Sequence, residues 1–185
     1  MRSILLVMVG LSACRPDDVK GDTSDPGETG ETADSGDTED SGDTDDTSAA
    51  DALLTDGVWL SEGDNISYLL QQYNFNSITA TFNIDGSYEV VAARSAGAPV
   101  TLSGTYGLDA STDPTSIELA QVSPYEDTAS GIFDIERSTM RYEVLSGSSA
   151  GTCTGPTPET GFGSTSCPGE DYPDNFNLQI FVLQQ

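Results

Sequence analysis

One long stretch of this chain has no side chain from which a hydrophobic core could be built, and this confines any fold to the remainder. Residues 20–52 contain no Val, Ile, Leu or aromatic residue and consist mostly of Asp, Glu, Thr, Ser and Gly. Such a segment buries too little apolar surface to offset the entropy of ordering, and its carboxylates repel one another. We therefore expect a disordered acidic linker over residues 14–55 and one folded domain over residues 56–185.

The first fourteen residues have the features of an export signal. Arg2 precedes a short apolar run and a site of small residues, and the run is far shorter than the roughly 20 residues of a transmembrane helix. Leu11-Ser12-Ala13-Cys14 resembles the lipobox of bacterial lipoproteins. The resemblance implies a signal peptide over residues 1–13, a diacylglycerol and a fatty acid such as palmitate at Cys14, and a place in the cell envelope. Because no Asp follows the cysteine, we expect the outer membrane.

Composition excludes several classes of function. A net charge of −25 with six Lys and Arg residues disfavours nucleic acid, because phosphate contacts need clustered positive charge. The absence of histidine removes Ser-His-Asp and Cys-His catalysis and the commonest ligand of transition metals. We expect no enzyme activity, no cofactor and no metal. The best oxygen cluster for a structural cation is better explained as surface turns, and comprises Glu170, Asp171, Asp174 and Asn175.

The two remaining cysteines, Cys153 and Cys167, are expected to form a disulfide. An export signal places them in an oxidising compartment, and the segment between them is rich in Gly and Pro. Closing a loop of this length stabilises a fold by about 3 kcal/mol in the chain-entropy model.

Residues 56–185 contain short segments of alternating apolar and polar residues, separated by Gly, Asp, Pro and Ser, as in an all-β domain. The clearest pair flanks Asp85-Gly86, a strong signal of a β-hairpin. With a segment around Trp59, the runs give about eight strands, enough for a small antiparallel β-barrel; a β-sandwich is the alternative. The positions expected to face the core are Ile78, Ala80, Phe82, Ile84, Tyr88, Val90, Ala92, Leu102, Gly104, Tyr106, Leu108, Ile117, Leu119, Phe133, Ile135, Met140, Tyr142, Val144, Phe176, Leu178, Ile180 and Val182.

A second resemblance concerns the barrel itself. Gly57-Val58-Trp59 is similar to the Gly-x-Trp of lipocalins. The residue patterns of three expected strand segments, 81–88, 103–106 and 131–135, look like those of bacterial lipocalin-like domains. The likeness covers most of residues 56–145 and implies a lipocalin-like barrel with the tryptophan at one end. An arginine packs on that tryptophan in lipocalins, and the candidates are Arg137 and Arg141, of which Arg141 should face water.

Residues 65–73 lie between the first two expected strands and have apolar residues at helical spacing. We expect a helix of one or two turns. In lipocalins the corresponding connection covers the open mouth of the barrel, so this helix is either a lid or a part of the core.

The sequence leads to a lipid-anchored envelope protein with a non-catalytic domain that binds a small hydrophobic ligand. The alternative is a structural or protein-interaction module with a packed barrel. A less favoured alternative is a hydrolase with paired carboxylates, but Glu118, Asp134, Glu136 and Glu143 should point away from the core into solvent. The residues expected to face a ligand are Trp59, Phe82, Tyr88, Tyr106, Phe133 and Tyr142.

Overall fold

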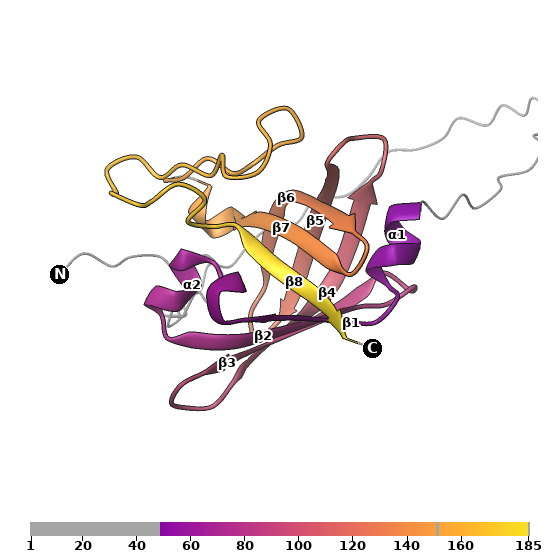
Figure 1. Cartoon of the computed structure of the whole chain (residues 1–185), viewed down its shortest axis with the longest axis horizontal. Helices are drawn as coiled ribbons and strands as arrows, with labels where there is room; N and C mark the ends of the chain where they lie inside the picture. The colour runs from indigo at the N-terminus through magenta and orange to yellow at the C-terminus, as the bar shows by residue number, and fades with distance from the viewer. Residues whose placement is uncertain (1–48, 151, 185) are drawn as a thin grey trace, which may run out of the picture. The chain divides into compact units, whose positions relative to one another are not determined.

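Eight antiparallel strands form a closed barrel in the computed structural model, which describes residues 49–150 and 152–184 (Figure 1). Each strand pairs with its neighbours in sequence, so the topology is a simple up-and-down meander. The strands are β1 (Val58–Glu62), β2 (Phe75–Phe82), β3 (Ser87–Arg94), β4 (Val100–Asp109), β5 (Thr115–Ser123), β6 (Asp127–Glu136), β7 (Thr139–Ser146) and β8 (Gln179–Gln184).

The first and last strands close the barrel. Trp59 of β1 lies opposite Ala80 of β2 on one side and opposite Leu183 of β8 on the other. β8 in turn pairs with β7, so that every strand has two partners. The expected small antiparallel barrel is confirmed, and the β-sandwich is excluded.

Short helices lie at the two ends of the barrel. At the end where β1 begins, α1 (Ala49–Leu54) packs Leu54 into the core, and the carbonyl of Leu54 accepts a 2.8 Å hydrogen bond from the indole of Trp59. The expected linker range 14–55 therefore overlaps the folded domain by the six residues of α1. None of the helices within the described residues is long and apolar enough to cross a membrane.

The opposite end carries the longer connections. η1 (Gly63–Asn65) and α2 (Tyr68–Gln72) join β1 to β2, and η2 (Gly147–Ser149) follows β7. α2 forms within the range where a helix was expected. Ile66 and Leu70 are buried in the main core, and Leu69 packs in a smaller cluster with Leu145 and Phe176. This helix therefore completes the core at its end of the barrel.

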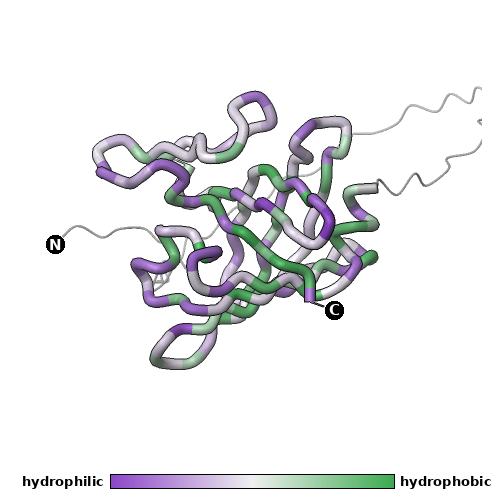
Figure 2. Tube along the Cα trace, in the orientation of Figure 1, coloured by the Kyte–Doolittle hydropathy of each residue, from purple (hydrophilic) through white to green (hydrophobic). Residues whose placement is uncertain are grey.

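The interior follows the expected alternation through most of the strands. Alternate apolar residues of the strands are buried in the core. Figure 2 shows that hydrophobic residues lie mostly along the strands and hydrophilic ones mostly in the loops. In β8 the expected inward positions Ile180 and Val182 are wrong. In β8 the inward residues are Gln179 and Phe181, and Val182 is exposed, so the alternation is shifted by one residue. The shift follows from pairing, because Met140 of β7 places Phe181 opposite itself, inside the barrel.

The hairpin between β2 and β3 forms where Asp85-Gly86 predicts it, but its loop is longer. Asn83 donates to the carbonyl of Ser87 and accepts from the amide of Gly86, which has the positive φ of 80° that a turn glycine allows. Ile84 was expected to face the core and is instead 83% exposed, since it lies in this loop beyond the end of β2.

Glycine packing provides a test of the barrel. A Cβ on Gly131 would lie 2.1 Å from the carbonyl oxygen of Glu143 on β7, whereas a Cβ on Gly107 would meet nothing within 4 Å. We predict that Gly131→Ala lowers the free energy of unfolding by at least about 2 kcal/mol, because β6 and β7 must separate. Gly107→Ala should change it by less than about 0.5 kcal/mol. Urea unfolding of both variants checks this, and equal stabilities would contradict the strand packing described.

Candidate functional site

The cavity found inside the barrel is small. Its volume is about 40 Å³, and its lining is mainly apolar, with Gln121, Asp127 and Ser146 as the principal polar groups. Pockets for drug-sized ligands are roughly 300 to 1,000 Å³, so this space accommodates a few water molecules. An eight-stranded barrel is just wide enough for its own side chains, and here they fill most of it.

The six residues expected to face a ligand separate into two groups. Phe82, Tyr88 and Tyr142 line the cavity. Trp59 and Phe133 are buried in the core away from it, and the hydroxyl of Tyr106 bonds to the carboxylate of Asp51 at 3.1 Å and the carbonyl of Asn83 at 2.9 Å. Hence three of the six are structural.

Two buried tyrosines give the cavity its chemistry. Burial, and secondarily the negative charge of Asp127, raise the pKa of Tyr88 to about 12. Burial also raises the pKa of Tyr142 far above its ordinary value, with a smaller contribution from Tyr88. Asp127 itself accepts hydrogen bonds from Ser146 at 2.5 Å and Ser148 at 3.2 Å. Both phenols are therefore neutral at neutral pH and poorly suited to act as proton-transfer groups there.

Part of the outer face of β6 and β7 is covered by the connection between β7 and β8, which we call the arm. It spans residues 147–178, of which residue 151 lies outside the described residues. Figure 1 shows its loops, orange to yellow, standing beyond the ends of β6 and β7. The outward-facing residues Ile132, Glu143 and Leu145 of these two strands are buried. The arm therefore forms a second layer outside the barrel.

Glu143 is the main polar anchor of the arm. Its side chain is 0% exposed, and its carboxylate accepts hydrogen bonds from the amide of Gly163 at 2.5 Å, the amide of Thr165 at 3.2 Å and the hydroxyl of Thr165. The expectation that Glu143 is solvated is wrong, because the arm covers the outer face of β7. A buried carboxylate is costly unless hydrogen bonds replace its water, and here three donors do so.

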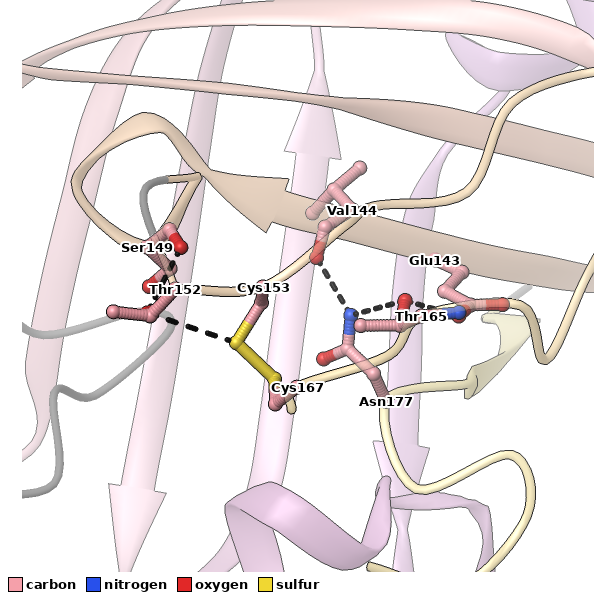
Figure 3. Close-up of a disulfide and its surroundings, with 8 residues drawn as sticks. All are labelled: Glu143, Val144, Ser149, Thr152, Cys153, Thr165, Cys167 and Asn177. Atoms are coloured by element: carbon pink, nitrogen blue, oxygen red, sulfur yellow. Dashed lines mark hydrogen bonds between the residues drawn. A yellow bond between two sulfur atoms is a disulfide. The ribbon is translucent and has the colours of Figure 1, made fainter. Parts of the chain in front are cut away.

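The disulfide between Cys153 and Cys167 is confirmed and closes the arm (Figure 3). Beside it, Thr154 and Ser166 exchange two backbone hydrogen bonds of 2.7 and 2.9 Å. Asn177 donates from its side chain to the carbonyl of Val144 at 2.8 Å, which ties the returning chain to β7. The arm is thus held by covalent and polar contacts at residues 153–154, 166–167 and 177.

The remaining carboxylates and arginines that the sequence singled out lie on the surface. Glu118 and Glu136 are exposed as expected, and Asp134 forms a 2.6 Å ion pair with Arg141. The guanidinium of Arg141 lies 4.5 Å over the ring of Phe162 in the arm. The indole of Trp59 donates to the carbonyl of Leu54, as described above, and Arg137 is exposed in the turn between β6 and β7.

No three His, Cys, Asp or Glu side chains gather as a metal site requires within residues 49–150 and 152–184. Of the expected oxygen cluster, Glu170, Asp171, Asp174 and Asn175 are exposed, and the side chain of Asn175 occupies the space beside Gly163. The signal peptide, Cys14 and most of the linker lie outside the described residues.

A groove outside the barrel is much larger than the cavity inside it. It has a volume of about 730 Å³ and lies between the outer faces of β4, β5 and β6 and the arm. Sequence analysis missed this site because it depends on the path of the arm. The signal that was present is a pair of adjacent apolar residues on each of two neighbouring strands, Ile132-Phe133 and Val144-Leu145, which indicates burial on both faces.

The role of Glu143 can be tested by removing one acceptor oxygen. We predict that Glu143→Gln lowers the free energy of unfolding by about 1 to 3 kcal/mol, because an amide group then faces donors that need an acceptor. Proteolysis of the arm should become faster. Glu118→Gln, at an exposed position, should change stability by less than about 0.5 kcal/mol. Urea unfolding and limited proteolysis measure both, and a stable, protected Glu143→Gln arm would contradict the anchor.

The cavity can be tested through Tyr88. Its pKa is higher in the folded than in the unfolded chain, so the stabilisation is fully present below about pH 10 and lost as the pH rises toward 12. We predict that Tyr88→Phe loses less stability than the unmodified chain over this range, and that Asp127→Asn lowers the pKa of Tyr88. Unfolding at several pH values and absorbance titration provide the measurements; identical pH slopes would disprove this assignment.

Comparison with known proteins gives no match: no protein family, no curated protein and no solved structure matches the chain. The barrel topology is consistent with the lipocalin-like fold that the Gly-x-Trp resemblance implies. The relationship itself stays a prediction from the sequence.

Proposed function

We propose that this chain is a lipid-anchored envelope protein whose barrel is a rigid, non-catalytic scaffold for protein interaction. The observation that carries the proposal is the contrast between the cavity of about 40 Å³ inside the barrel and the groove of about 730 Å³ outside it. A carrier of hydrophobic ligands needs a large cavity inside the barrel. The lipocalin-like architecture, on this proposal, provides stability while the outer surface provides recognition.

The arm supports an interaction role because its position is fixed before any partner arrives. Three contacts restrict its position: the Cys153–Cys167 disulfide, the hydrogen bonds to Glu143 and the hydrogen bond from Asn177. A surface that is already ordered loses less conformational entropy when it binds. This favours recognition over a purely spacing role for the domain.

The alternatives fit these contacts less well. A hydrolase with paired carboxylates needs two of them facing a substrate across an open cleft, yet Glu143 is committed to the arm and Asp134 to Arg141. A small hydrophobic ligand would have to displace the side chains that fill the barrel. The proposed anchor at Cys14 and the acidic linker would hold the domain near an outer membrane, within reach of other envelope proteins.

Photo-crosslinking in the native host tests this proposal. A crosslinking residue at the exposed Ser166 of the arm should give a discrete adduct with an envelope protein, whereas one at the exposed Glu89 of β3 should not. Cys14→Ala should move the protein out of the membrane fraction and weaken the adduct. The proposal fails if a hydrophobic molecule copurifies with the protein at a one-to-one molar ratio and is lost in the variant Val90→Phe, which fills the cavity. The domain would then be a carrier.

A further inference from the structure

Apart from Glu118, the floor of the groove outside the barrel consists of short side chains. The floor residues are exposed, and Gly107 of β4 has open space around the position of a Cβ. Another polypeptide backbone can therefore approach these strands closely. Bulky side chains at these positions would prevent such an approach. The floor residues are Thr105, Gly107, Glu118, Ala120, Thr128 and Ser130.

One wall of the groove is a short extended segment of the arm, Cys153-Thr154-Gly155. Thr154 directs both of its backbone groups to Ser166. In an extended chain the neighbouring groups point the other way, so the carbonyl of Cys153 and the amide of Gly155 face away from Ser166. Neither has a hydrogen-bond partner among the described residues. Their spacing allows one residue of an incoming extended chain to bond to both, as in a parallel ladder.

The charge of the groove indicates the side chains of its occupant. Glu118 is the one charged side chain among the described residues that line it, and it is exposed on the floor. Residues 49–184 contain 18 Asp and Glu against three Arg and no Lys, so the field of the domain attracts cations. A lysine or arginine over Glu118 would complement this site, while an acidic segment would be repelled.

We propose that this groove binds an extended segment of a partner protein that carries a lysine or arginine opposite Glu118. The segment lies along Cys153-Thr154-Gly155 as an added strand and places its basic side chain on the floor. This inference rests on the interaction role proposed above and assigns the surface, the backbone conformation and the charge of the partner.

Selection from a random heptapeptide library, displayed on phage against the intact purified domain with its disulfide, tests the inference. The selected peptides should be enriched in Lys or Arg at one position. Ala120→Trp, which fills the floor, should weaken their binding at least tenfold. Glu118→Lys should weaken it by a similar factor, and a second selection against this variant should yield acidic peptides. Glu89→Lys and Glu89→Trp, on the exposed outer face of β3, should leave binding within twofold.

The outcomes separate this inference from the wider proposal. Peptides without basic enrichment, or peptides that bind Ala120→Trp as well as the unmodified domain, overturn the groove as the site. If crosslinking from Ser166 still captures an envelope protein, the interaction role stands and only its location is wrong. Circular dichroism and urea unfolding of each variant confirm that the substituted barrel is folded, and a destabilised Ala120→Trp is replaced by Ala120→Arg, which should also abolish binding of basic peptides.

Discussion

The pairing of β1 with β8 is the contact on which the rest of the structure depends. It turns a meander into a closed barrel and leaves none of the eight barrel strands with an open edge. Closure also fixes the interior diameter, since the number of strands and their tilt determine the radius. With Trp59, Phe133 and Phe181 fully or almost fully buried, that interior is occupied by the protein itself. Recognition is therefore left to the outer surface.

The shape of the outer surface depends on a carboxylate that is buried on the outer face of β7. In a barrel without a covering layer, this face would be exposed to solvent. Glu143 points away from the interior, yet the arm seals it from water and supplies its hydrogen bonds. A buried carboxylate at this position is stable only if the covering chain places hydrogen-bond donors beside it. This requirement restricts the path that the arm can take over β7. The disulfide restricts the same loop independently, and the two constraints together define the wall of the groove.

Much of the barrel could be predicted because a strand with one buried face has a period of two. Segments such as residues 78–82 and 88–92 therefore revealed their inward faces, and the Asp85-Gly86 hairpin formed where expected. Alternation alone failed in β8, where Phe181 and its two apolar neighbours are compatible with either face and only pairing with Met140 decides. The disulfide followed from the cysteine count.

The candidate site was harder to predict, because it belongs to two segments that are close only after folding. Alternation assigns Glu143 to the outside, which is right, and to solvent, which is wrong, because the pattern of one strand contains no information about a covering layer. Adjacent apolar residues at Ile132-Phe133 and Val144-Leu145 are the local trace of that layer. The groove needs in addition the turn of the arm at Cys153-Thr154-Gly155, which no periodicity encodes.

The boundary between covered and open surface lies within a single strand, and this argues that the groove is not incomplete packing. On the outer face of β6, Ile132 is buried under the arm, while Ser130 and Thr128 are exposed. If the arm extended further, it would have to bury these hydroxyls and the carboxylate of Glu118, each of which would need a new partner. The apolar part of this outer face thus ends at the edge of the surface that the arm covers. The groove therefore stays open in the folded domain. A chain that enters it must itself supply the polar partners.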